Sequence, residues 1–341
     1  MKPAPLYLIL VVFVSLLAIQ EKVFAQGTDT SNILAANAKL KEIFSEGETF
    51  LEGPTMSPDG LLFFSDIALT NGVPGKAGII WSLNPLTGES KVFRSPSGMS
   101  NGLMFDANGD LIVCEGADFG GRRVTKTDMK TGKSVIIAGL YQGRPFNAPN
   151  DLAIDEQGRI YFTDPRYVGH ESVEQFVMGV YRIDKDSTIH LVAANVNRPN
   201  GIIISPDQKT LYVVNADYPG NGNLRFLPDD FSGVKPTPEG SLMVYHLMPD
   251  GSLRFKQKFE HAKGDGMTID TEGNLYIATG EKVEVFSSDG KKITEIKTPQ
   301  ATNLCFGRGH FNKTLFIAGG KGIYTIETKK EGYNITFNKK Q

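Results

Sequence analysis

The sequence has few of the residues that form disulfides or bind zinc: two cysteines, Cys114 and Cys305, and five scattered histidines. An exported protein could pair the two cysteines. The repeats described below place them in different blades of the fold, however, so we expect two buried, unpaired thiols. The formal net charge is only −2 at pH 7, which excludes the strongly basic surface that nucleic-acid-binding proteins use.

Signals of several other protein classes are also missing. No Gly-x-Ser-x-Gly motif and no convincing Ser-His-Asp set occurs, so a serine nucleophile is not indicated. No amphipathic helix of useful length follows residue 40, and no apolar stretch after the N-terminus is long enough to span a membrane. The chain is long enough for one large domain with a substantial core.

The long apolar run that does occur lies at the N-terminus. Lys2 precedes Leu6–Ile19, and Val23–Ala25 offers small residues where a signal peptidase cuts, which predicts a signal peptide of residues 1–25 cleaved after Ala25. A transmembrane anchor is the alternative, but the run is short for that. We therefore expect a secreted or periplasmic protein without stable membrane insertion, with an N-terminal linker (26–37) before its folded domain (38–341).

A short phrase recurs six times along that domain: an apolar run, a polar turn, and a second apolar run that ends in a polar residue. Met56–Asp66 and Asp155–Asp164 are clear copies, and the pattern is typical of a β-hairpin. The turns stand at Gly60, Gly109, Gly158, Gln208, Gly273 and, more loosely, Lys313. Six copies with a period of about fifty residues predict an all-β fold, a six-bladed β-propeller with four strands in each blade.

Two insertions interrupt the period, Ala216–Gly240 and Tyr167–Met178. Insertions on one face of a repeat array often shape a binding surface, although a loop can also simply tolerate extra length. We expect the ring of blades to close by pairing a strand near Leu40–Phe44 with strands at Ile323–Ile326 and Ile335–Phe337. The sequence leaves open which of these lies outermost.

One polar residue opens the first strand of each copy in the same phase. Glu52 lies 14 residues before Asp66, and Asn200 lies 15 residues before Asn215. Because equivalent positions of a propeller's blades surround its central channel, we expect six such residues to form a ring at one end of that channel. They are Glu52, Asn101, Asn150, Asn200, Asp265 and, with a small slip in phase, Asn303.

The ring is an all-oxygen donor set with two carboxylates. Any one of its Asn residues could simply form a local turn, as Asn followed by Gly often does. Six in phase, two of them acids that would repel each other, are better explained by a bound cation, because an unpaired buried carboxylate is costly. Such donors suit Ca²⁺, or another divalent cation such as Mg²⁺ or Mn²⁺, whereas the absence of His and Cys disfavours Zn²⁺.

Four motifs resemble those of the gluconolactonase family, which includes regucalcin (senescence marker protein) and is related to the squid-type phosphotriesterase. The likeness covers about residues 38–338. The motifs are Glu52-Gly-Pro54, Pro149-Asn-Asp-Leu152 followed by Tyr161-Phe-Thr-Asp-Pro165, Arg198-Pro-Asn-Gly201, and Gly264-Asp-Gly-Met267. The resemblance implies a six-bladed propeller that hydrolyses sugar lactones.

The resemblance also implies roles for individual residues. Glu52, Asn150, Asn200 and Asp265 would ligate the metal directly, and Asn101 and Asp151 would lie beside the site, touching substrate or metal-bound water. Two positions depart from the family's pattern. Met56 stands where the family often has an aromatic residue, and Ala148 stands where some members have a substrate-binding Arg, so the identity of the substrate is in doubt.

This pattern predicts a metal-dependent hydrolase that opens a sugar lactone by metal-polarised attack of water. Asp265 is the first candidate for the base and Asp151 the second. Substrate contacts are expected from Asn101 and Asn150.

Three further side chains are weaker candidates for substrate contacts. Arg166 and Arg122 could bind an acid group or hydroxyls of the substrate. His170, in the loop after Asp164, could reach the channel mouth, although a solvent-exposed loop histidine is the more common explanation.

Two other functions remain open from the sequence. The same metal site could serve an aryl esterase or phosphotriesterase, because a metal polarises phosphoryl and carbonyl oxygens alike. A propeller with purely structural calcium could also act as a binding module, and the fold alone does not decide between these functions.

Overall fold

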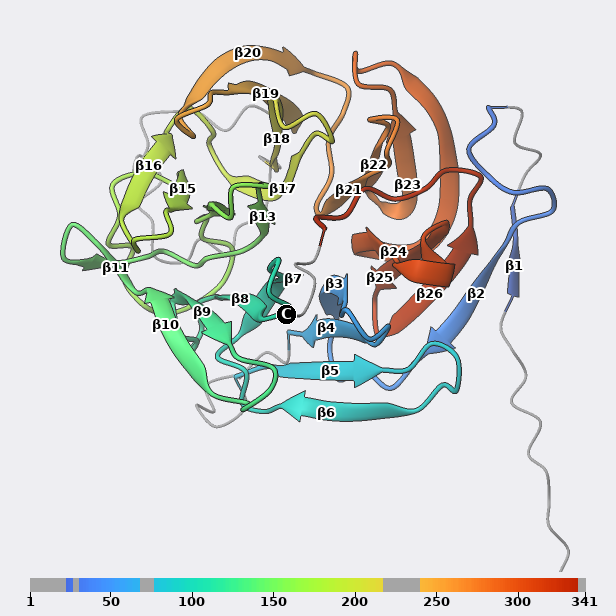
Figure 1. Cartoon of the computed structure of the whole chain (residues 1–341), viewed down its shortest axis with the longest axis horizontal. Helices are drawn as coiled ribbons and strands as arrows, with labels where there is room; N and C mark the ends of the chain where they lie inside the picture. Colours follow the sequence, from blue (N-terminus) through green and yellow to red (C-terminus); the bar gives the residue numbers. More distant parts are fainter. Residues whose placement is uncertain (1–22, 27–30, 68–76, 217–239, 337–341) are drawn as a thin grey trace, which may run out of the picture.

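The computed structural model describes residues 23–26, 31–67, 77–216 and 240–336, and its strands form a ring of six blades around a central axis (Figure 1). The predicted six-bladed β-propeller is confirmed. In the described part of the chain, the helical content is one 3-10 turn, Gly309–Phe311. None of these residues forms a helix that is long and apolar enough to cross a membrane.

Four blades are separate four-stranded antiparallel sheets. Blade 1 contains β3 (Leu51–Met56), β4 (Leu62–Asp66), β5 (Ile79–Leu83) and β6 (Ser90–Arg94). Blade 2 contains β7 (Ser100–Phe105), β8 (Leu111–Glu115), β9 (Arg123–Thr127) and β10 (Ser134–Ala138). Blade 3 contains β13 (Leu152–Ile154), β14 (Ile160–Thr163), β15 (Val180–Ile183) and β16 (Ile189–Ala193). Blade 4 contains β17 (Pro199–Ile204), β18 (Thr210–Asn215), β19 (Ser241–Leu247) and β20 (Leu253–Phe259). A small hairpin of β11 (Leu140–Tyr141) and β12 (Arg144–Pro145) joins blades 2 and 3.

Blades 5 and 6 share one strand, so they form a continuous eight-stranded sheet. The shared strand is the 15-residue β24 (Lys292–Phe306): its first part pairs with β23 and its last part with β25. Blade 5 also contains β21 (Met267–Ile269), β22 (Leu275–Ala278) and β23 (Gly280–Phe286), and blade 6 contains β25 (Thr314–Gly319) and β26 (Gly322–Glu327).

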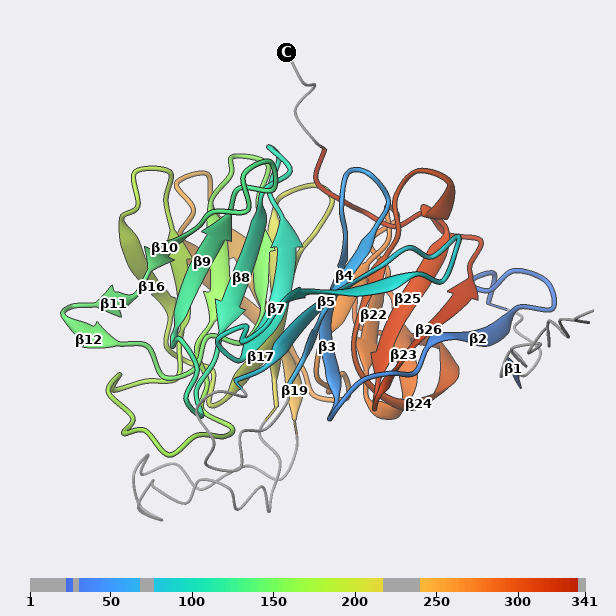
Figure 2. The ribbon, with the colours of Figure 1, turned by 90° about the horizontal axis from the view of Figure 1, so that it is seen from below.

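The N-terminal strand β2 (Lys39–Phe44) completes blade 6 by pairing with β26 (Figure 1). β1 (Val23–Ala25) adds a short strand outside it, so the N-terminal strands are the outermost ones. The other expected closing strand does not form: Ile335 lies in no strand, and Phe337 is outside the described residues. Instead the C-terminal segment after β26 runs across one end of the molecule (Figure 2), and the backbone N–H of Tyr333 donates to the Ile269 carbonyl at 3.0 Å.

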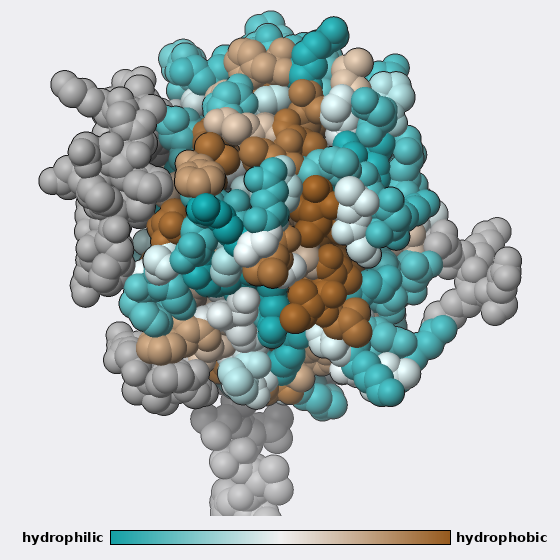
Figure 3. Space-filling view, turned by 90° about the vertical axis from the view of Figure 1, so that its left-hand side faces the viewer, coloured by the Kyte–Doolittle hydropathy of each residue, from teal (hydrophilic) through white to brown (hydrophobic). Residues whose placement is uncertain are grey.

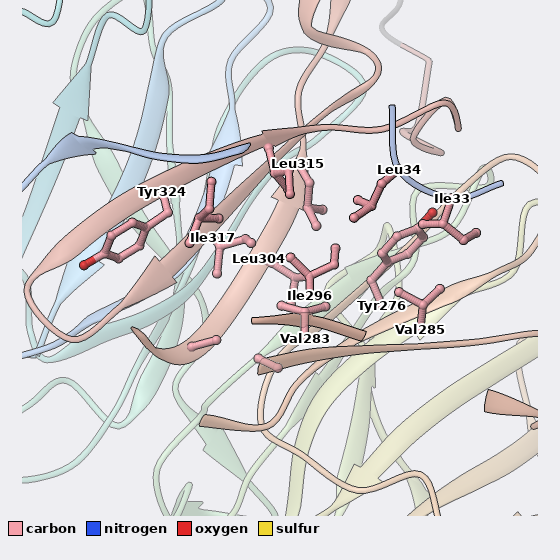
Figure 4. Packing of buried hydrophobic residues seen from close by; sticks show 14 of the residues in the cluster. Ile33, Leu34, Tyr276, Val283, Val285, Ile296, Leu304, Leu315, Ile317 and Tyr324 are labelled. Carbon is pink, nitrogen blue, oxygen red and sulfur yellow. The ribbon is translucent and has the colours of Figure 1, made fainter. Parts of the chain in front are cut away.

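Each blade is held by apolar side chains that alternate between its two faces, as the period-2 pattern requires. In the core of blades 5 and 6, Ile33 and Leu34 pack beside Tyr276 and Leu315 (Figure 4). These two N-terminal residues are only 1% and 4% exposed, although they fall in the range predicted as a linker. The thiols of Cys114, which is buried, and Cys305, which is half-buried, are both free, which confirms that prediction.

The inner strands of neighbouring blades are joined by hydrogen bonds all the way around the channel. Glycine permits the close approach: a Cβ on Gly102 would lie 2.7 Å from the Cα of Asp151. The bonds run from Ser65 Oγ to the Asn101 carbonyl (2.8 Å), from Gly102 N to the Asn150 carbonyl (2.7 Å), from Ile202 N to the Asp151 carboxylate, from Gly201 N to the Asp265 carbonyl (3.1 Å), from Gly266 N to the Thr302 carbonyl (2.8 Å), and from Thr302 Oγ1 to the Leu51 carbonyl (2.5 Å). The ring is therefore closed at the level of the predicted polar residues.

Candidate metal and substrate site

Five of the six residues predicted to form the ring line one pocket at the mouth of the channel. They are Glu52, Asn101, Asn150, Asn200 and Asp265, contributed by the start of the inner strand in each of the first five blades. The pocket has a volume of about 200 Å³. The common phase in the sequence therefore corresponds to a common level along the channel axis.

The local fold fixes that level through the polar residue that ends each second strand. Asp66 accepts the backbone N–H groups of Glu48 (2.6 Å) and Thr49 (3.1 Å), just before Glu52. The same arrangement recurs in blades 3 and 4. Asp164 accepts the N–H groups of Asn147 and Ala148, both at 2.8 Å, and Asn215 accepts that of Arg198 at 3.2 Å. In blades 1, 3 and 4, the offset of 14 or 15 residues thus corresponds to a hydrogen bond that holds the loop leading to the ring residue.

Asp164→Asn is expected to destabilise the protein by about 1–3 kcal/mol, because a carboxamide has one acceptor oxygen and leaves one buried N–H of the Asn147–Ala148 loop unsatisfied. Urea unfolding measures the loss. Asp128→Asn is the control: Asp128 also accepts two backbone N–H groups, but both donate to Oδ1 in an exposed turn, so the carboxamide oxygen can keep both bonds. Equal losses for the two variants would contradict the assigned role of Asp164.

Asp151 and Asn303 lie next to the pocket rather than on its surface. Asn303 Nδ2 is 3.3 Å from Asp151 Oδ2, across the channel from blade 6 to blade 3. The Asn303 side chain also hydrogen-bonds the Glu52 carboxylate, and Leu152 N donates to Asp151 Oδ1 at 2.9 Å. These two residues therefore connect the ring across the axis, and Asp265 is the predicted base that lines the pocket itself.

Three carboxyl groups share this region of low solvent access. Burial raises the pKa of Asp265 to about 7 and that of Asp151 to about 6. Burial, and then repulsion by Asp265 and Asp151, raises the pKa of Glu52 well above its usual range. The largest cause of all three pKa shifts is burial, which disfavours the charged form of a carboxyl group.

The donor set fits a hard divalent cation. Among the described residues, no group of three or more His, Cys, Asp and Glu side chains is placed to bind one metal ion. A cation here would therefore need the amide oxygens of the Asn residues as well as the two carboxylates of Glu52 and Asp265. The same pocket also contains an unsatisfied acceptor, Oδ1 of Asn101, which is buried and has no hydrogen-bond partner. A buried carbonyl oxygen without a partner is unfavourable unless a ligand satisfies it, and hard oxygen donors are those that Ca²⁺ and Mg²⁺ select.

Comparison with known proteins agrees with this site. A family model described as "SMP-30/Gluconolactonase/LRE-like region" matches residues 50–320.

The chain belongs to this family.

The resemblance inferred from the four motifs is thereby confirmed. A gluconolactonase of Zymomonas mobilis is 30% identical over 309 residues, which span 85% of this chain and 82% of the relative. A lactonohydrolase of Aspergillus oryzae is 27% identical over 327 residues, spanning 88% and 72% of the two chains. A solved gluconolactonase from Xanthomonas campestris superposes with a TM-score of 0.71 and 26% identity, covering 90% and 94%. These relatives support a lactone-hydrolysing function.

The two departures from the family's pattern lie in different places. Ala148 lines the pocket, so a larger residue there would face the substrate. Met56 is buried at the other end of β3, where its sulfur lies 3.1 Å from the backbone N of Arg308. Of the two, only Ala148 is placed to alter the choice of substrate.

The arginines and the histidine named from the sequence lie apart from the pocket lining. Arg166 is 3% exposed, and its guanidinium donates to the carbonyls of Glu171 (2.6 Å) and Asn147 (2.8 Å). Arg122 Nε donates to the Phe146 carbonyl at 2.7 Å. The half-exposed ring of His170 packs on Phe119, with 4.1 Å between ring centroids. These contacts brace the loops beside the channel, and substrate binding by Arg166 and His170 stays a prediction.

Apolar side chains form the sides of the pocket, and no pattern in the sequence indicated them. We call Phe50, Ile67, Met99, Ala148, Tyr167 and Val168 the apolar wall. All six lie outside the strands, where no period marks which side of the chain faces the site. The first two residues of the Tyr167–Met178 insertion, Tyr167 and Val168, line the pocket. Residues 217–239 of the other insertion are outside the described residues.

Proposed function

We propose that the protein is a metal-dependent lactonase, with a sugar lactone as the substrate that the family resemblance indicates. The observation that carries this proposal is the convergence of Glu52, Asn101, Asn150, Asn200 and Asp265 on one pocket, with Oδ1 of Asn101 unpaired. Glu52, Asn150, Asn200 and Asp265 would hold a divalent cation, for which Ca²⁺ is the first candidate. Such a cation, when bound, supplies positive charge that polarises a carbonyl group.

The chain's own residues would carry out the proton transfers. The Asp265 carboxylate, oriented by a hydrogen bond from the Asn200 side chain, would accept a proton from water. The resulting hydroxide adds to the lactone carbonyl, the ring C–O bond breaks, and the leaving alkoxide takes the proton back from Asp265. The product is a hydroxy acid, and the carboxylate is regenerated. Asn101 would contact the substrate, and Asp151 would keep Asn303 in place.

Hydrolysis of glucono-δ-lactone, followed as acid release above the spontaneous rate, tests the proposal. We expect turnover with Ca²⁺ and its loss in EDTA. Because a cation that binds only the folded state stabilises it, Ca²⁺ at about 100 times its Kd should raise the free energy of unfolding by about 2.7 kcal/mol. If Ca²⁺ raises the free energy of unfolding but no lactone or ester is hydrolysed, the ion is structural and the protein is a binding module. Turnover of phosphotriesters but of no lactone would indicate the phosphotriesterase instead.

We also propose that the protein acts outside the cytoplasm, because residues 1–25 have the pattern of a signal peptide. Recovery of the protein only from the cytoplasmic fraction, with Met1 still attached, would contradict this.

A further inference from the structure

The pocket combines a polar base with an apolar wall, and part of this wall forms a hydrophobic cluster of its own. Phe50, Ile67, Ala77 and Met99 pack together away from the cores of the blades. Ile67 and Met99 are 6% and 2% exposed, and Phe50 is half-buried. Three of the four line the pocket. These loop residues of blades 1 and 2 are therefore held rigidly enough to act as a preformed surface.

Blade 3 supplies the opposite part of the wall through Ala148, Tyr167 and Val168. The Tyr167 hydroxyl donates to the Arg198 carbonyl, at 3.4 Å. The Arg198 guanidinium stands over the Tyr167 ring, 5.5 Å from its centroid. Tyr167 thus offers the pocket an aromatic ring whose polar atom is already engaged.

Among the described residues, no Lys, Arg or His lines this pocket. The guanidinium groups of Arg122 and Arg166 donate to backbone carbonyls, and that of Arg198 stands over the Tyr167 ring. An anionic substituent on a substrate would therefore find no positively charged side chain among the described residues that line the pocket. The hydroxyls of a polyhydroxylated lactone that face the wall would find no hydrogen-bond partner, which is unfavourable for any buried polar group.

We propose that the preferred substrate is a neutral lactone carrying an apolar substituent, with the lactone carbonyl at the polar base and the substituent against the apolar wall. The proposal rests on the lactonase function proposed above and specifies its substrate class. It also moves the preference away from the polyhydroxylated sugar lactones that the family resemblance suggests.

Kinetics with a series of δ-lactones tests this preference. The probes are δ-lactones with alkyl side chains of one to five carbons, glucono-δ-lactone, and 6-phosphoglucono-δ-lactone, all with Ca²⁺ present. We expect kcat/KM to rise about fourfold for each of the first three methylenes, which is the factor expected when one CH₂ group is buried. Most of this rise should come from a lower KM. Equal or faster turnover of glucono-δ-lactone, or no dependence on chain length, would overturn the substrate class while leaving the lactonase function standing.

Binding of unreactive analogues separates failure of this inference from failure of the proposed function. δ-Lactams with the same alkyl chains are not readily hydrolysed, and calorimetry measures their affinity with or without turnover. Affinity that rises with chain length supports the wall's role even if no lactone is hydrolysed. Affinity independent of chain length overturns it.

An isosteric substitution provides the matched control. Val168→Thr places a hydroxyl in the wall at nearly constant volume, whereas Val135→Thr makes the same change on β10, where the side chain is 58% exposed. We expect the first to lower kcat/KM for the alkyl lactones about fivefold, with glucono-δ-lactone little affected, and the second to leave both unchanged. Ala148→Arg is expected to favour the phosphorylated lactone. Identical behaviour of Val168→Thr and Val135→Thr would overturn the proposal.

Discussion

Asp265→Asn is expected to lower kcat/KM for lactone hydrolysis by about 10²- to 10⁴-fold, the usual contribution of a general base. The change preserves the size of the side chain and one oxygen donor, but it removes the negative charge and the proton acceptor that lines the pocket. Initial rates at saturating Ca²⁺ measure the effect. Asp207→Asn, which changes an acid in an exposed turn of blade 4, should leave the rate unchanged.

Comparison with Glu52→Gln separates the base from a ligand. Both carboxylates line the same pocket, but Glu52 is assigned to the cation alone. Glu52→Gln should need a higher Ca²⁺ concentration for half-maximal activity. It should recover much of its activity as the Ca²⁺ concentration is raised, because the amide still offers an oxygen ligand. Asp265→Asn should not recover. Full recovery of Asp265→Asn at high Ca²⁺ would show that Asp265 is a ligand only, and Asp151 would then become the candidate base.

Removal of residues 1–44 is expected to abolish folding. This truncation deletes β2 and with it four buried apolar side chains, Ile33, Leu34, Leu40 and Phe44. At about 1.5–3 kcal/mol for each buried side chain, their loss is comparable to the whole stability of a typical domain. The truncation also exposes the edge of β26, and exposed strand edges promote aggregation.

The chain that begins at Gln26, the N-terminus that the proposed cleavage would leave, is the control for this truncation. Of the described strands it lacks only β1, whose Val23 and Phe24 are 43% and 38% exposed. Its urea midpoint should match that of the full chain closely. Near-UV circular dichroism and urea unfolding compare the chains. A cooperative transition at a similar midpoint for residues 45–341 would refute the closing role of β2.

Phe44 explains why the effect should extend beyond blade 6. Its ring packs against Phe64 and Trp81 of blade 1, with centroid distances of 4.9 and 5.3 Å. The N-terminal strand therefore joins the last blade to the first by side-chain packing as well as completing a sheet.

Much of the architecture was predictable from the sequence because the turns recur at a regular period. Gly60, Gly109, Gly158, Gln208 and Gly273 all adopt positive φ, as tight turns at those positions require. The phase of Glu52, Asn101, Asn150, Asn200 and Asp265 was predictable for the same reason, since each repeat places its equivalent residue at the same level.

The rest could not be inferred because its signals do not recur. Ile335 has a strand-like apolar context, but the edge of β26 is already occupied by β2, so the C-terminal segment takes another course. Arg166 and His170 follow Asp164 closely in sequence, yet sequence distance does not tell which direction a loop side chain takes. Asn303 does not line the pocket with the other five ring residues, and its side chain instead hydrogen-bonds the carboxylates of Asp151 and Glu52.

The outer surface adds one feature that the repeat pattern did not indicate. Apolar side chains gather on the side of the molecule where β10 and β11 lie (Figure 3). The exposed ones from this part of the chain include Val135, Ile136 and Leu140, each more than half exposed. Since outward positions of an outer strand are usually polar, β10 departs from simple alternation.

The placement of the apolar wall bears on how enzymes with this architecture diversify. Its six residues belong to connecting segments, so exchanging them breaks no ladder hydrogen bond and leaves the inter-blade hydrogen bonds at the channel intact. The polar residues at the base cannot be exchanged as freely. The hydrogen bonds that join neighbouring blades are made by their own backbone groups or by those of adjacent residues. Selection can therefore alter which molecules are accepted through a few loop substitutions, while the reactive centre and the ring that supports it stay constant across descendants.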